Sequence, residues 1–178
     1  MKIGVIADTH IPDLLPSLPP RVEEVFQGLD IILHLGDICT VETLHQLENK
    51  LTITMAVAGE KDEEETKGYL EEKKVVRFGE SSIGMIHGHQ EESRSGWGAL
   101  MSRLLFGFSQ EELCKYVLDQ FEDVNCVVFG HSHRPYVKMW GRVLLFNPGA
   151  VAPSAGLRPT VGILNVSGKM ITGRIVYL

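Results

Sequence analysis

The first ten residues, Met1–His10 with the sequence MKIGVIADTH, decide the fold class of this chain. Their apolar run Ile3–Ala7 contains Val and Ile without a helical period, which is typical of a strand covered on both faces. Strands are also predicted at Ile31–Leu35 and Leu51–Ala58, and polar residues follow each of them at once. Strands that end on polar loops indicate an open α/β sheet, which holds its functional site at the carboxyl ends of its strands.

Helices are predicted between and after these strands. One covers about Arg21–Gln27 and is closed by Gly28, and a second runs from a cap at Thr40 through about Lys50. A short charged helix is expected near Glu63–Glu72, and a capping box predicts another over Ser109–Phe121. The alternation of strand and helix in the first half favours the α/β class.

The remaining strands are concentrated in the second half. They are predicted at Val75–Phe78, Ser82–Ile86, Val124–Phe129, Tyr136–Trp140, Arg142–Phe146, Thr160–Val166 and Lys169–Tyr177. The first two form a hairpin, and the last four are expected as a meander. We therefore expect one domain over residues 1–178, with two packed mixed β-sheets flanked by helices. The stretch 91–108 has no clear pattern, and we interpret its apolar group as a lid or a contact between copies in a homo-oligomer; the group is Trp97, Leu100, Leu104, Leu105 and Phe106.

Composition narrows the class of protein. The chain has 178 residues, 44% of them hydrophobic and 22% charged, with a formal net charge of −6. These values exclude disordered and fibrous classes, and the acidic balance argues against stable nucleic-acid binding. No apolar run is long enough to span a membrane, the start is unlike a signal peptide, and three cysteines without CxxC spacing suit a reduced, cytoplasmic protein.

Carboxylates and histidines follow nearly every predicted strand. They are Asp8, His10, Asp37, Glu60, His87, His89, His131 and His133. Taken singly, such residues are more often solvated loop histidines and helix-capping aspartates. Clusters at five strand ends are hard to obtain by chance, and these side chains are the usual ligands of Mn, Fe, Ni and Zn. The sequence therefore predicts a transition-metal site.

The order of these motifs resembles the calcineurin-like metallophosphoesterases. The motifs are Asp8-Thr9-His10, Gly36-Asp37, Gly59-Glu60-Lys61-Asp62, His87-Gly88-His89 and Gly130-His131-Ser132-His133. The compact length and three further stretches resemble the small single-domain branch, which holds bacterial and archaeal phosphodiesterases together with the eukaryotic retromer scaffold subunit. Those stretches are Gly36-Asp37-Ile38, Ile86-His87-Gly88-His89-Gln90 and Asn147-Pro148-Gly149.

The resemblance implies an αββα sandwich with two divalent transition-metal ions, manganese first among the candidates and nickel, iron or zinc as alternatives. Its ligand set for the first metal corresponds to Asp8, His10 and His133. Its ligand set for the second corresponds to Glu60, His87 and His131. Asp37 would bridge the two and share in the catalysis. A water between two such cations has a lowered pKa and becomes the nucleophile at neutral pH.

Two positions depart from the family pattern. Catalytic members usually have Asn where this chain has Glu60, so the longer carboxylate either ligates the second metal or turns away from it. Lys61 stands where larger phosphatases have a leaving-group histidine. His89 is our candidate proton donor, with a hydrogen-bonding role in the loop as the alternative reading.

The leading functional prediction is a metal-dependent phosphodiesterase acting on small phosphodiesters by two-metal activation of water. The alternative is a protein-binding scaffold with a vestigial metal site. A phosphomonoesterase is less favoured because the leaving-group histidine is missing.

Five other stretches are singled out with structural rather than chemical readings. His34 is expected in the core and His45 on a solvated helix face. The acidic run Asp62–Glu65 is interpreted as a solvated face, and Arg134 as a salt-bridge partner with phosphate contact as the alternative. Asn147 is either a hydrogen-bonding residue near the metals or part of a turn.

Overall fold

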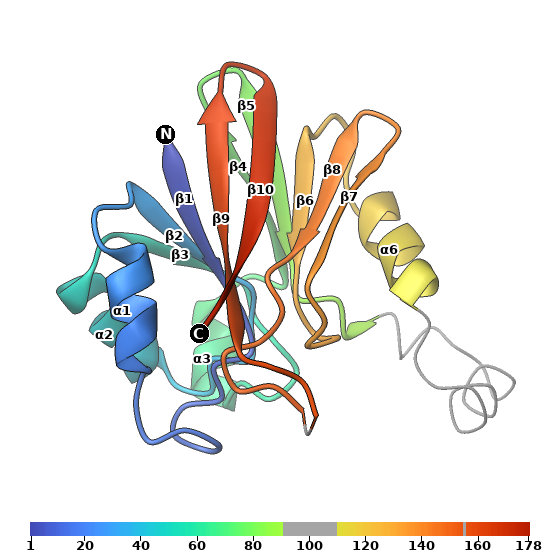
Figure 1. The fold of residues 1–178 in the computed structure, drawn as a ribbon. Helices are drawn as coiled ribbons and strands as arrows, with labels where there is room; N and C mark the ends of the chain where they lie inside the picture. The colour runs from blue at the N-terminus through green and yellow to red at the C-terminus, as the bar shows by residue number, and fades with distance from the viewer. Residues whose placement is uncertain (91–109, 155) are drawn as a thin grey trace, which may run out of the picture.

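The computed structural model describes residues 1–90, 110–154 and 156–178, which form two five-stranded sheets packed face to face (Figure 1). The elements in chain order are β1 (Lys2–Ile6), α1 (Pro20–Phe26), β2 (Ile31–His34), α2 (Val41–Lys50), β3 (Thr54–Ala56), α3 (Glu64–Tyr69), β4 (Lys73–Phe78), β5 (Ser81–Ile86), α6 (Gln110–Asp119), β6 (Cys126–Phe129), β7 (Tyr136–Trp140), β8 (Val143–Asn147), β9 (Thr160–Ser167) and β10 (Met170–Tyr177).

Both sheets are mixed. The first has the order β10-β9-β1-β2-β3, with β1, β2 and β3 parallel, β9 antiparallel to β1, and β10 antiparallel to β9. The second has the order β4-β5-β6-β8-β7, with β5, β6 and β8 parallel and an antiparallel strand at each edge. The expected α/β architecture of two packed mixed sheets with flanking helices is confirmed.

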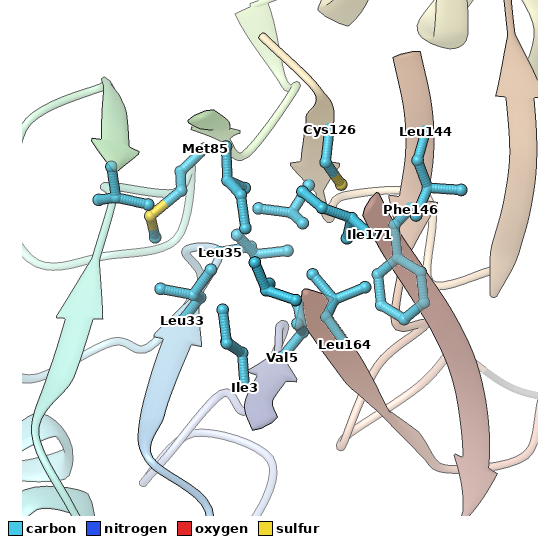
Figure 2. Packing of buried hydrophobic residues seen from close by; sticks show 14 of the residues in the cluster. Ile3, Val5, Leu33, Leu35, Met85, Cys126, Leu144, Phe146, Leu164 and Ile171 are labelled. Carbon is cyan, nitrogen blue, oxygen red and sulfur yellow. The ribbon is translucent and has the colours of Figure 1, made fainter. Parts of the chain in front are cut away.

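Alternation along β1 shows how the sequence builds the layers. Ile3 and Val5 point between the sheets, where they join Leu33, Phe146 and other buried side chains (Figure 2). Ile6 points the other way and packs in a cluster with residues of helices α1 and α2. Because successive strand residues face opposite sides, a strand that is apolar throughout must be covered on both faces. Helix α6 covers the outer face of the second sheet in the same way.

Two expectations about the strands were wrong in detail. Strand β3 has three residues rather than the eight of Leu51–Ala58, because Leu51 ends helix α2 with its N–H bonded to Leu47 O at 2.9 Å. The last four strands do not form one meander, because β7 and β8 join the second sheet while β9 and β10 join the first. Turn residues mark each hairpin in the sequence, but only long-range packing decides which sheet it completes.

Helix α6 lies within the helix predicted from the capping box, whereas Ser109 and the apolar group of stretch 91–108 lie outside the described residues. Among the described residues, no helix has the length and apolar character needed to cross a membrane.

The parallel strands of both sheets run in the same direction, so the loops after β1, β2, β3, β5, β6 and β8 meet at one end of the sandwich, the lower end in Figure 1. All the predicted site residues follow strands that end there.

Candidate metal centre

The loops at this end are held in an uncommon backbone conformation. Of the seven described non-glycine residues with positive φ, six lie in these loops: Asp8, His10, Asp37, Cys39, His131 and His133. Positive φ is unfavourable for residues with a Cβ, and it persists where the surrounding structure imposes it, often at functional sites. Five of the six are predicted metal ligands, so the strain coincides with the candidate site.

Asp8, His10 and His133 form one group, with a ligand atom from each within 4.8 Å of the others. His133 Nε2 lies 3.4 Å from Asp8 Oδ1, and the rings of His10 and His133 are 5.6 Å apart. Burial alone would raise the pKa of Asp8, but the close approach of His133 Nε2 and the charges of the neighbouring histidines lower it, so Asp8 is a carboxylate at neutral pH.

Asp8 also belongs to a second group, with Asp37 and His87, whose ligand atoms likewise lie within 4.8 Å of one another. Asp37 Oδ1 lies 3.4 Å from His87 Nε2, and Asp37 Oδ2 lies 3.6 Å from His10 Nε2. The two oxygens of Asp37 therefore face a histidine from each group, which is the arrangement a bridging carboxylate requires. That bridging role stays a prediction.

The hydrogen bonds of His87 test whether a cation fits between these groups. His87 Nδ1 lies 2.7 Å from Leu35 O and must donate to it, so in the neutral ring Nε2 carries a lone pair. That lone pair faces Asp37 Oδ1, another acceptor. Both oxygens of Asp8, His10 Nε2 and His87 Nε2 are buried and make no hydrogen bond to any described residue. A buried lone pair of His87 Nε2 that faces a carboxylate oxygen is unfavourable, and a divalent cation between the two atoms would satisfy both. The residues present fit such an ion.

The remaining predicted ligands are His131 and Glu60, and the candidate proton donor His89 lies near the first of them. The ring of His87 is 5.4 Å from that of His131 and 5.3 Å from that of His89. Glu60 is exposed, and its carboxylate accepts a hydrogen bond from Lys61 Nζ at 2.9 Å. That hydrogen bond lowers the pKa of Glu60. The structure thus brings His131 and His89 beside the two groups but leaves the Glu60 side chain turned to Lys61, and its ligation of a metal stays a prediction.

His89 is half-buried, and this affects the role expected for it. Burial lowers the pKa of His89, and the adjacent His87 and His131 lower it further. A neutral imidazole at neutral pH offers one N–H donor rather than a full positive charge.

One important residue was misread from the sequence. Asp62 belongs to the acidic run interpreted as a solvated face, but it is buried. Its Oδ1 accepts hydrogen bonds from the N–H groups of Ile38 and Cys39 at 2.6 and 2.8 Å, and its Oδ2 accepts one from Gly59 at 2.7 Å. Asp62 therefore ties the loop after β2, which carries Asp37, to the loop after β3. The other three residues of the run, Glu63–Glu65, are exposed as expected.

Asn147 holds the loop after β6 by side-chain hydrogen bonds, as Asp62 holds the loops after β2 and β3. Its Nδ2 donates to Gly130 O at 2.8 Å and to Ser132 Oγ at 3.2 Å, so it supports the segment that carries the last two histidines. Arg134 is exposed and makes no ion pair with any residue that the structure describes, so the salt bridge expected for it is not found.

His34 lies in the core beneath the site, as expected, while His45 is exposed on α2. His34 Nε2 is 3.1 Å from Oγ1 of Thr9, the residue between the candidate ligands Asp8 and His10 in the sequence. Burial lowers the pKa of His34 to about 3. The folded protein therefore keeps this ring neutral over a pH range in which an unfolded chain would protonate it.

This difference predicts acid sensitivity. Between about pH 6.5 and pH 3 the unfolded state binds one proton more than the folded state, so the free energy of unfolding should fall by roughly 1 kcal/mol per pH unit as the pH drops. Urea unfolding of the parent and of His34→Gln between pH 7 and pH 5 measures how the free energy of unfolding changes with pH. The variant should lose the part of this pH dependence that comes from His34. The exposed His45→Gln is the control and should keep the parent slope. Equal slopes for the parent and His34→Gln would contradict the assignment.

Comparison with known proteins shows the family to which the chain belongs. The family model described as the calcineurin-like phosphoesterase superfamily domain matches residues 1–169. The chain belongs to this superfamily. A probable metallophosphoesterase of Methanothermobacter thermautotrophicus is 28% identical over 99% of this chain and 92% of the relative. A phosphodiesterase of Methanocaldococcus jannaschii is 25% identical over 95% of each chain.

Among solved structures, this calcineurin-like phosphoesterase resembles Vps29 of Entamoeba histolytica in complex with zinc. The TM-score is 0.71 at 23% identity, with 99% of each chain covered. At that identity the likeness confirms the fold alone.

Proposed function

We propose that this calcineurin-like phosphoesterase is a metal-dependent phosphodiesterase that hydrolyses small phosphodiesters with two divalent transition-metal ions. Manganese is the first candidate, and nickel, iron and zinc are alternatives. The observation that carries the proposal is the pair of carboxylate–histidine groups that share Asp8, with the Nε2 lone pair of His87 turned toward a carboxylate oxygen of Asp37. Three buried free thiols support a reducing, cytoplasmic setting.

Each ligand has a proposed place. Asp8, His10 and His133 would hold one ion; His87, His131 and Glu60 would hold the other, with Asp37 between them. When bound, the ions would supply Lewis-acid chemistry, which acidifies water and neutralises charge on a phosphate. The half-buried His89 would direct its N–H to a phosphate or leaving-group oxygen. Glu60 would have to leave Lys61 to reach the second ion.

The preference for diesters rests on what the loop after β3 lacks. Lys61 stands where a histidine would assist the departure of a poor leaving group, and its backbone N–H instead donates to Asp37 Oδ1 at 2.8 Å. The relative named a phosphodiesterase supports the same substrate class.

A protein-binding scaffold is the second candidate. It is favoured by the exposed, lysine-paired Glu60 and by the structural likeness to Vps29. In that case metal binding would persist without hydrolysis.

Hydrolysis of bis(4-nitrophenyl) phosphate separates the two. With manganese the protein should hydrolyse this diester at least about 100-fold faster than after chelation, and faster than 4-nitrophenyl phosphate. Manganese should also raise the melting temperature, since a ligand that binds only the folded state stabilises it. A raised melting temperature with no hydrolysis would support the scaffold. No change in either would contradict the metal centre itself.

A further inference from the structure

His133 makes contacts that set the position of its ring proton. The backbone N–H of Ser154 donates to His133 Nδ1 at 2.9 Å, and Ser154 Oγ lies 3.0 Å from the same nitrogen. A backbone amide can only donate, so Nδ1 must be the acceptor. In the neutral ring the proton is therefore on Nε2, which points at Asp8 Oδ1 at 3.4 Å.

His87 holds the opposite tautomer. Its Nδ1 donates to Leu35 O, a group that can only accept, and its Nε2 is left with a lone pair toward Asp37. A metal ion needs a lone pair on the nitrogen that binds it. His87 is thus prepared to ligate through Nε2, whereas His133 carries a proton at the position where it would ligate.

We infer that Ser154 is a positioning residue that controls metal occupancy of the group formed by Asp8, His10 and His133; this inference rests on the proposed metal-dependent function. For Nε2 of His133 to bind, its proton leaves to solvent and another is taken up at Nδ1, with no net change. Ser154 Oγ is then the acceptor for Nδ1–H. In this tautomer the Ser154 N–H and the His133 Nδ1–H are two donors that face each other, so the Ser154 N–H must turn away.

The movement required is local. Ala152 N–H donates to Asp8 O at 3.0 Å, and Leu157 N–H donates to Ser154 O at 3.1 Å, so the segment is held on both sides of Ser154. Because this rearrangement costs free energy and the His87 group needs none, the group with His87 should fill first and the group with His133 second.

The tautomers can be read by nitrogen NMR of protein labelled with ¹⁵N-histidine, at about pH 8.5, which is roughly two units above the ordinary pKa of histidine. Signals of His133 are assigned with His133→Gln, and zinc serves as the diamagnetic metal. We expect Nε2–H for His133 without metal and Nδ1–H with zinc, while His87 keeps Nδ1–H throughout. A metal-free His133 with its proton on Nδ1 would overturn the inference.

Calorimetric zinc titration tests the serine itself. Ser154→Ala should weaken one of two sites by about 10- to 100-fold, the usual cost of losing a hydrogen-bond partner of a metal-binding histidine. Ser154→Thr should restore it, and the exposed Ser167→Ala, at the other end of β9, should match the parent. Equal affinities for the parent and Ser154→Ala would overturn the role of Ser154 but leave the metal centre standing. Absence of zinc binding by the parent would overturn the proposed function together with this inference.

Discussion

Replacing Asp37 by asparagine is expected to remove both metal ions and to lower diester hydrolysis by roughly a thousandfold or more. The two oxygens of Asp37 face His10 on one side and His87 on the other, at 3.6 and 3.4 Å. Two cations close together need anionic ligands between them, and an amide supplies no charge. A thousandfold loss corresponds to about 4 kcal/mol of transition-state stabilisation, which is within what metal ions provide.

Elemental analysis and a diester assay measure these effects, and thermal unfolding in chelator checks that the variant folds. The amide introduced by Asp37→Asn would keep an oxygen for the Lys61 N–H, so stability without metal should be close to that of the parent. Asp119→Asn, at the exposed last residue of α6 and in neither group of candidate ligands, is the matched control and should retain both ions. Two ions retained by Asp37→Asn would disprove the bridging role.

Replacing Gly59 by alanine is expected to have the largest effect on stability, a loss of roughly 3 kcal/mol or more. A Cβ at this position would lie 2.0 Å from Asp37 N and 2.3 Å from Asp37 Oδ1, so one of the two loops must move. The movement is resisted because Asp62 binds the N–H of Gly59 and those of the residues after Asp37. The displaced carboxylate should also weaken metal binding.

Chemical unfolding of the metal-free protein isolates the steric effect. Gly68→Ala is the matched control, because nothing lies within 4 Å of the added Cβ and its helical position favours alanine by up to about 1 kcal/mol. A Gly59→Ala variant as stable as the parent would mean that the two loops do not pack as closely as the structure has them.

Much of the site could be predicted because it depends on local pattern. An apolar strand that ends on a polar loop places Asp8 and His10 at the carboxyl end of β1, and the same holds for Asp37 after β2 and His87 after β5. Parallel strands bring such loops to one end of a sandwich, so the convergence of these side chains follows from the order of the motifs. The core role of His34 follows from its place inside an apolar strand.

Other features depend on groups that are distant in the chain. Asp62 has the same sequence context as its exposed acidic neighbours, and it is distinguished by the N–H groups of Ile38 and Cys39, 24 and 23 residues away. The sheet that each C-terminal hairpin joins is likewise decided by packing, since both hairpins have buried inner strands.

The candidate metal ligands could be named from the sequence, because residue type and a position at the end of a strand are local properties. Which ring nitrogen of His87 and of His133 carries the proton depends instead on backbone groups that only the folded chain brings to them. The proton of His87 is set by Leu35 O, 52 residues away, and that of His133 by the Ser154 N–H, 21 residues away. A backbone carbonyl and a backbone amide impose opposite tautomers on identical side chains. Residue types alone do not indicate which of these two groups a histidine will contact in the folded chain.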